Sequence, residues 1–197
     1  MPAGPWKLLT CGKVPDDVAP IVNTSEFAYD SVRQSIRFAF SENVSASLSV
    51  NDLLLENLST EQTIPSGNIS LSYNAGTNVA TFTFPGYAYG ALPNGNYRAT
   101  LLAAGVTDAS GNRLATNLEL NFFFVQGDAD HNGVINFDDY ALIDAGFNAG
   151  RTGFSNGDFN YDGVVKFDDY AIIDQAFVSQ NRPSPKPSPK PSPRPGR

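Results

Sequence analysis

The sequence predicts two domains, an all-β sandwich followed by a small all-α unit, and then a proline-rich tail. Three observations predict this order. Residues 21–126 carry few charges and alternate polar with apolar residues in short stretches. Residues 127–178 contain one acidic segment written twice, and residues 179–197 consist mainly of proline, serine and basic residues. Residues 1–20 form an N-terminal flank, and 197 residues suffice for two small domains.

The alternating stretches in the first domain are short and are separated by turn signals. They cover residues 35–40, 69–73, 79–84, 97–101 and 118–122. The turn signals are Asn74-Ala75-Gly76, Pro93-Asn94-Gly95-Asn96 and Asp108-Ala109-Ser110-Gly111-Asn112. Strands at this spacing are typical of an antiparallel sandwich, and about 105 residues is the size of one such domain.

Two pieces of this region carry a resemblance to a known family. They are S-I-R-F-A-F-S-E-N-V near its start and L-P-N-G-N-Y-R-A-T-L followed by G-V-T-D-A-S-G-N-R-L near its end. On these residues the region resembles the bacterial Ig-like domains of secreted and surface-layer proteins. The resemblance implies a spacer or presentation module without catalysis. The alternative is an unrelated β-sandwich, for which the expected function is nearly the same.

The second domain repeats one acidic loop of twelve residues. The two copies are D-A-D-H-N-G-V-I-N-F-D-D, from Asp128 to Asp139, and D-F-N-Y-D-G-V-V-K-F-D-D, from Asp158 to Asp169. Both place oxygen-bearing side chains at loop positions 1, 3, 5 and 12 and glycine at position 6, which is the pattern of a calcium loop. Two such loops in register predict two bound Ca²⁺ ions.

The ligand positions follow from the chemistry of calcium, which takes about six to eight oxygen ligands. A short chain supplies that many by wrapping around the ion, and a glycine at position 6 permits the turn that brings the next carbonyl inward. Position 9 acts through a water, a role that suits Asn136 and does not suit Lys166. The predicted ligands are Asp128, Asp130, Asn132, Val134, Asn136 and Asp139 in the first loop, and Asp158, Asn160, Asp162, Val164 and Asp169 in the second. The alternative is a pair of acidic Asx-type turns that bind no ion.

A helical pattern follows each loop directly. Apolar residues recur at spacings of three and four, namely Phe137, Tyr140, Ile143 and Phe147, and again Phe167, Tyr170, Ile173 and Phe177. This spacing predicts one apolar face on each helix, and we expect the two helices to bury these aromatic rings against each other. No helical pattern precedes either loop, so each unit is a loop with an exiting helix only.

The repeated segments carry a second resemblance. They read G-D-A-D-H-N-G-V-I-N-F-D-D-Y and G-D-F-N-Y-D-G-V-V-K-F-D-D-Y, and on them residues 127–178 resemble a dockerin. The resemblance implies two calcium ions, a pseudo-twofold pair of antiparallel helices, and docking onto a cohesin-like protein partner. Cellulosomal dockerins commonly carry small hydroxyl residues at positions 10 and 11, whereas this chain carries Phe137-Asp138 and Phe167-Asp168. The departure affects the partner-binding positions and leaves the calcium positions intact.

Charge and composition limit the function classes. The net charge is −7, and residues 127–178 hold ten acidic side chains against Arg151 and Lys166, so nucleic acid is not an expected partner. One histidine and one cysteine form no catalytic constellation, and we expect no enzyme activity.

No apolar run reaches transmembrane or signal-peptide length. Because such loops fill where calcium is plentiful, we expect an extracellular or cell-surface location, with this chain as the C-terminal piece of a longer protein or with a mis-called start.

Three functions remain open at this point. The first is an attachment module that docks an exported protein onto a cohesin-like or other surface partner. The second is a calcium-stabilised cap or spacer of a surface protein. The third is an accessory region of a polysaccharide-degrading enzyme, reaching the cell surface or a polysaccharide through its parent protein. The tail, with five basic residues, predicts an extended polyproline segment that serves as a linker or as a ligand for another protein or an anionic surface.

Overall fold

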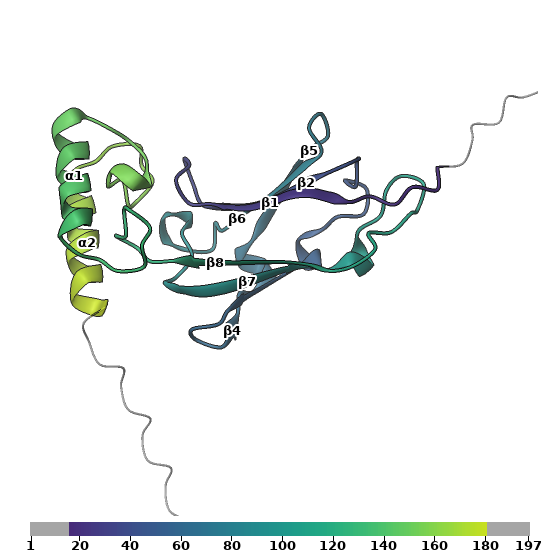
Figure 1. Ribbon diagram of the computed structural model, residues 1–197, viewed down its shortest axis with the longest axis horizontal. Helices are drawn as coiled ribbons and strands as arrows, with labels where there is room; N and C mark the ends of the chain where they lie inside the picture. Colours follow the sequence, from purple (N-terminus) through teal and green to yellow (C-terminus); the bar gives the residue numbers. More distant parts are fainter. Residues whose placement is uncertain (1–15, 181–197) are drawn as a thin grey trace, which may run out of the picture. The chain divides into compact units, whose positions relative to one another are not determined.

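The computed structural model describes residues 16–180, which form two compact units that divide after Phe124 (Figure 1). The division lies two residues before the predicted boundary at 126. The predicted extended tail from residue 181 onward, and most of the predicted N-terminal flank, lie outside the described residues.

The first unit is a sandwich of two four-stranded antiparallel sheets, as the alternating pattern predicts. One sheet has the order β1-β2-β6-β5, and the other has the order β4-β3-β7-β8. The strands are β1 (Val22–Ala28), β2 (Ser35–Phe40), β3 (Leu53–Asn57), β4 (Gln62–Thr63), β5 (Ser70–Asn74), β6 (Val79–Thr83), β7 (Gly95–Leu101) and β8 (Leu118–Phe124).

Alternation along the strands places the apolar side chains between the sheets. On β2 the side chains of Ile36 and Phe38 are fully buried, and on β6 the ring of Phe82 meets that of Phe38 edge to face with centroids 6.0 Å apart. The facing sheet contributes Leu55 on β3 and Leu101 on β7, both fully buried. Side chains of both sheets therefore form this core.

The second unit consists of α1 (Phe137–Ala149) and α2 (Phe167–Gln180), each entered from an acidic loop. The helices lie side by side and antiparallel, since Tyr140 of α1 meets Phe177 of α2, and Phe147 of α1 meets Tyr170 of α2 (Figure 1). Within the described residues no α-helix precedes either loop, as predicted; a single 3₁₀ turn, Phe154–Asn156, precedes the second. Neither helix is long and apolar enough to span a bilayer, and the same holds throughout the described part of the chain.

The predicted aromatic face of the helices is only partly correct. Ile143 and Ile173 are fully buried, but Phe137 and Phe167 are 91% and 80% exposed. Each of these phenylalanines is the first residue of its helix, and the exposed ring of Phe167 still contacts Phe147 of α1 with centroids 5.6 Å apart. The core is completed instead by residues outside the two helices, namely Ile135, Phe154, Phe159, Tyr161 and Val165.

The unit also extends beyond its predicted end at residue 178. α2 continues to Gln180, whose side-chain oxygen accepts a hydrogen bond from the backbone N–H of Ile135 at 2.9 Å and whose amide nitrogen donates to the Ile135 carbonyl. The last residue of the second helix therefore satisfies both backbone polar groups of Ile135 in the first loop. Gln180 belongs to the folded unit and not to the tail.

Candidate metal centre

In the first loop the carboxylate of Asp128 is fully buried and organises the chain around it. Its two oxygens accept hydrogen bonds from the backbone N–H groups of Asn132 at 3.0 Å and Gly133 at 2.8 Å. The carboxylate at the other end of the loop, Asp139, is also fully buried and accepts from the N–H of Ala129 at 2.7 Å. Asp130, an exposed residue, completes a trio with these two, whose carboxylate oxygens lie within 4.8 Å of one another. Three predicted ligands therefore converge on one point.

The second loop repeats these three hydrogen bonds at the equivalent positions. Asp158 accepts from the N–H groups of Asp162 at 3.1 Å and Gly163 at 3.0 Å, and Asp169 accepts from the N–H of Phe159 at 2.8 Å. Asp158 and Asp169 are as buried as their counterparts. The carboxylates of this loop form no equally tight trio, because position 3 holds Asn160 in place of an aspartate.

Backbone conformations repeat as well. Position 6 of each loop is a glycine in the left-handed region, with φ of 90° at Gly133 and 87° at Gly163. Position 4 is left-handed in both loops with φ of 57° at His131 and 58° at Tyr161, although neither residue is glycine. The sequence predicts the glycines, and no residue-type signal predicts the second pair.

The two residues predicted at position 9 differ in the role they take. Asn136 is the N-cap of α1, and its side-chain oxygen accepts from the N–H of Asp138 at 2.6 Å while Asp139 accepts from the N–H of Asn136 at 2.8 Å. The helix cap thus uses the predicted ligand and the closing carboxylate together. Lys166 instead directs its ammonium at Asp162, a predicted ligand, and lies 3.7 Å from Asp168.

The remaining predicted ligands lie in the exposed middle of the loops. Position 5 bonds to the N–H of position 7 in both copies, Asn132 to Val134 at 2.9 Å and Asp162 to Val164 at 3.0 Å. Both valine side chains are about half exposed. All eleven predicted ligands therefore lie in two loops of the same hydrogen-bond pattern.

Burial has an electrostatic cost at these carboxyls. It raises the pKa of Asp128 to about 6, against the opposing effect of the N–H donors of Gly133 and Asn132. Burial also raises the pKa of Asp169. In the exposed part of the second loop the hydrogen bond from Lys166 lowers the pKa of Asp162, and the same bond raises the pKa of Lys166. The first loop thus concentrates negative charge, while the second carries its own ammonium.

The donor set fits calcium. Every predicted ligand offers a carboxylate, amide or backbone oxygen, which are the ligands a hard cation takes, and no sulfur or imidazole competes in either set. Two buried carboxylates in each loop need a cation or a proton to offset their repulsion. Calcium would supply that charge and draw the loop oxygens together.

The two halves are joined by reciprocal contacts. The Tyr140 hydroxyl donates to Asp174 at 2.7 Å, and the Tyr170 hydroxyl donates to Asp144 at 2.6 Å. Gly127 before the first loop lies against Ile173 of α2, and Gly157 before the second lies against Ile143 of α1. A Cβ at Gly157 would lie 2.6 Å from the Ile143 side chain, so each loop packs on the opposite helix. Ordering one loop therefore supports the other half.

A further acidic group lies in the sandwich, where the sequence shows no pattern for it. Carboxylate oxygens of Asp16, Glu42 and Asp108 lie within 4.8 Å of one another. Burial and the neighbouring Asp108 carboxylate raise the pKa of Glu42. Asp108 is satisfied within its own turn, since it accepts from the N–H groups of Ser110 and Asn112 at 2.8 Å each. The three residues are remote in sequence, and only the fold brings them together.

Comparison with known proteins identifies the first unit. The family model for the bacterial Ig-like domain matches residues 16–124, which is more than half of the chain. No curated protein matches the chain. The family match ends where the sandwich ends, so the dockerin resemblance of the second unit stays a prediction.

Proposed function

The chain belongs to the bacterial Ig-like domain family, and we propose that its C-terminal unit is a non-catalytic, calcium-binding attachment module that this sandwich presents. Domains of this family occur in bacterial surface proteins, which supports an extracellular or cell-surface location. The observation that carries the proposal is the paired burial of Asp128 with Asp139 and of Asp158 with Asp169 in two loops of one hydrogen-bond pattern.

Calcium binding is the first step of the proposed mechanism. Asp128, Asp130 and Asp139 would hold one ion with the other oxygens of their loop, and Asp158 with Asp169 would hold the second. Because the loops pack on opposite helices, binding at either loop would stabilise the whole pair.

The test is a count of bound ions. Calorimetric titration of the full chain is expected to give two calcium ions per chain. Asp139→Ala and Asp169→Ala are matched variants, one at position 12 of each loop, and each should reduce the count to one. Glu119→Ala on the exposed face of β8 is the control and should leave it at two. No uptake of calcium by the full chain would overturn the proposal.

Docking is the second step, and its surface centres on the two exposed phenylalanines. Phe137 and Phe167 occupy equivalent positions of the two halves, and each is followed by an exposed aspartate, Asp138 or Asp168. Large apolar side chains exposed at equivalent positions mark a contact surface. We infer a partner with an apolar centre and a basic rim, such as a cohesin-like protein, that associates in a salt-sensitive manner.

Two further repeated aspartates lie on the helices and join them to each other. Asp144 and Asp174 also repeat between the two copies, and they accept the tyrosine hydroxyls that join the helices. They support the competing function, a calcium-stabilised cap that needs no partner. The accessory role beside a polysaccharide-degrading enzyme stays a prediction about a parent protein.

A matched pair of variants separates docking from capping. A partner isolated in calcium from exported proteins of the source organism should be lost with Phe137→Ser plus Phe167→Ser, while two calcium ions still bind. Val178→Ser removes an apolar side chain that is 53% exposed at the end of α2 and should leave capture unchanged. If the partner still binds the variant with both phenylalanines replaced, or still binds in chelator, the proposed docking surface is wrong and the cap is favoured.

A further inference from the structure

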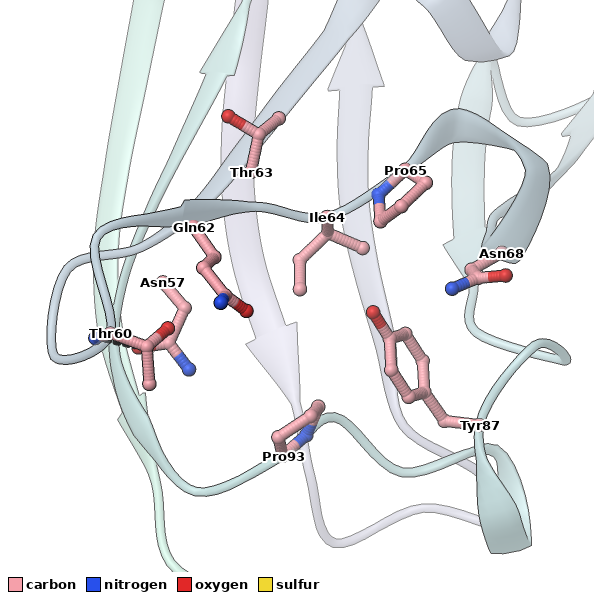
Figure 2. Close-up of a pocket in the computed structure, with 9 residues that line it drawn as sticks. All are labelled: Asn57, Thr60, Gln62, Thr63, Ile64, Pro65, Asn68, Tyr87 and Pro93. Carbon is pink, nitrogen blue, oxygen red and sulfur yellow. Dashed lines mark hydrogen bonds between the residues drawn. The ribbon is translucent and has the colours of Figure 1, made fainter.

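The sandwich has a pocket of about 470 Å³ (Figure 2). None of the residues that line it is a predicted calcium ligand. It lies between the β3–β4 hairpin and the loops that carry Tyr87 and Pro93. Its volume is in the range of small-molecule sites in proteins. No lining residue bears a charge at neutral pH.

One wall of the pocket is fixed by an amide that the protein satisfies internally. Asn57 is buried; its side-chain nitrogen donates to the Asn94 carbonyl at 3.2 Å and to the Tyr97 hydroxyl at 3.1 Å. Its side-chain oxygen accepts from the N–H groups of Ser59 at 3.0 Å and Thr60 at 3.2 Å. This network joins the β3–β4 hairpin to the Asn94 carbonyl and the Tyr97 hydroxyl.

Two asparagines, Asn57 and Asn68, line the pocket, and a glycine lies against the side chain of each. A Cβ at Gly95 would lie 2.4 Å from the Asn57 side-chain oxygen, and one at Gly86 would lie 2.5 Å from the Asn68 side chain. Both positions therefore accept only glycine without a shift of the amide. The fold therefore shapes this pocket, because glycines at positions 86 and 95 leave the space that the side chains of Asn68 and Asn57 occupy.

Three polar side chains in the pocket have no hydrogen-bond partner among residues 16–180. The side chains of Gln62, Asn68 and Tyr87 line the pocket but make no hydrogen bond to the described part of the chain. Figure 2 shows Gln62 and Tyr87 directed into the open space, with Ile64 above it and Pro93 below. An amide or phenol both donates and accepts hydrogen bonds. The pocket thus combines three two-way hydrogen-bonding groups with one aromatic ring and apolar walls.

We propose that this pocket binds a neutral saccharide. Hydroxyl groups of a sugar both donate and accept, which matches the two amides and the phenol. The C–H face of a sugar ring suits the Tyr87 ring and the surfaces of Pro65, Pro93 and Ile64. The absence of charge in the lining favours a neutral ligand over a phosphorylated or acidic one.

The chain's own tail is a poorer match for this pocket. Its proline-rich sequence carries five basic residues and no acids, and the lining offers no carboxylate to pair with them. A polyproline segment also docks on grooves of several aromatic rings, whereas Tyr87 is the one aromatic residue in this lining. Saccharide binding does not depend on the calcium proposal, because the pocket lies wholly in the sandwich.

The experiment titrates the full chain with a panel of neutral oligosaccharides of glucose, xylose, mannose and N-acetylglucosamine, followed by calorimetry and backbone amide NMR. At least one is expected to bind and to shift the amides of Gln62 and Tyr87, equally in calcium and in chelator. Tyr87→Ala should weaken binding about tenfold, and Gln62→Ala about threefold. Asn121→Ala, at an exposed amide on β8 outside the pocket, should leave the affinity unchanged.

Gln62 is exposed on the two-residue strand β4, so its truncation keeps the test valid even where Tyr87→Ala destabilises the fold. Three results would overturn the proposal. One is no binding by any oligosaccharide of the panel. Another is affinity that both pocket variants leave unchanged. The third is a synthetic peptide of residues 182–197 that shifts the Gln62 and Tyr87 amides, which would make the pocket a peptide site.

Discussion

The two units of this protein bury different chemistry. In the sandwich, the interior consists of apolar side chains such as Phe38, Phe82 and Leu55, and Asp108 is its one buried acid among the described residues. The far smaller C-terminal unit buries four, namely Asp128, Asp139, Asp158 and Asp169. Burial of apolar surface stabilises the first unit by itself, whereas buried carboxylates cost free energy until a cation or proton offsets them.

Polar contacts hold the C-terminal unit together in addition to its small core. Backbone N–H groups satisfy the buried carboxylates in part, and the reciprocal tyrosine–aspartate bonds fix the helix pair. About 50 residues without a disulfide form a marginal core, so we expect stability to depend on the ion. We expect no such dependence in the sandwich, because its core is apolar, and it therefore serves as an internal reference for measurements on the second unit.

The largest expected effect comes from core truncation, one variant in each unit. Phe38→Ala removes a fully buried ring and should destabilise the sandwich by about 3–5 kcal/mol, with the C-terminal unit unchanged. Phe154→Ala removes a ring that packs on Phe159 and should affect only the C-terminal unit. Excess calcium should raise the stability of the C-terminal unit in the Phe154→Ala variant and should leave the stability of the sandwich in the Phe38→Ala variant unchanged. Chemical denaturation followed by NMR measures the free energy of unfolding of each unit. A Phe38→Ala sandwich whose stability changes with calcium would contradict the difference between the units.

The pH dependence of the ion-free C-terminal unit should be the next largest effect. The Asp128 carboxyl has a pKa of about 6 in the folded chain against an ordinary 3.8, so it binds its proton more tightly when folded. Its contribution is fully present below the ordinary pKa and is lost as the pH rises through about 6. In chelator, lowering the pH from about 7 to 5 should therefore restore part of the fold of this unit, measured as a gain in helix content by circular dichroism.

In excess calcium the trend should reverse, because protons compete with the ion for the same carboxylates. The sandwich transition in the same samples is the control. Helix content that stays constant or falls when the pH is lowered in chelator would show that Asp128 is not held in this buried environment.

The smallest effect concerns the difference between the loops. Lys166 pairs with Asp162, a predicted ligand, and its ammonium repels an arriving cation. We therefore expect the second site to bind calcium more weakly than the first, and Lys166→Asn to tighten it by about two- to fivefold. Arg151→Asn removes a positive charge outside both loops and should leave both affinities unchanged. Equal affinities in the unaltered chain, measured by calorimetry, would contradict this account.

Sequence predicts the repeated parts of the molecule best. Alternation locates β2, β5, β6, β7 and β8, and the duplicated loops locate α1 and α2. The strand β3 escapes because Leu53-Leu54-Leu55 is apolar throughout and shows no alternation, although the structure buries only every second residue. The strand β1 is not predicted, because none of its side chains is fully buried and its sequence does not alternate regularly.

The candidate sites show the same limit. The ligand positions follow from spacing alone, but the cap at Asn136, the salt bridge of Lys166 and the Gln180–Ile135 pair depend on distances that only the fold sets. Helical spacing overestimates the burial of Phe137 and Phe167, since it does not show that each begins its helix. The pocket in the sandwich joins residues from three connections that no local pattern links.

The central claim is that calcium controls the fold of the C-terminal unit and not that of the sandwich. A backbone amide NMR spectrum of the full chain, recorded in excess calcium and again in chelator, tests it directly. In calcium, resonances of both units should be dispersed, and binding at a hundredfold excess over Kd adds about 2.7 kcal/mol per site. In chelator, the resonances of residues 125–180 should lose dispersion while those of residues 16–124 keep their positions. A spectrum that is unchanged in chelator would contradict the account.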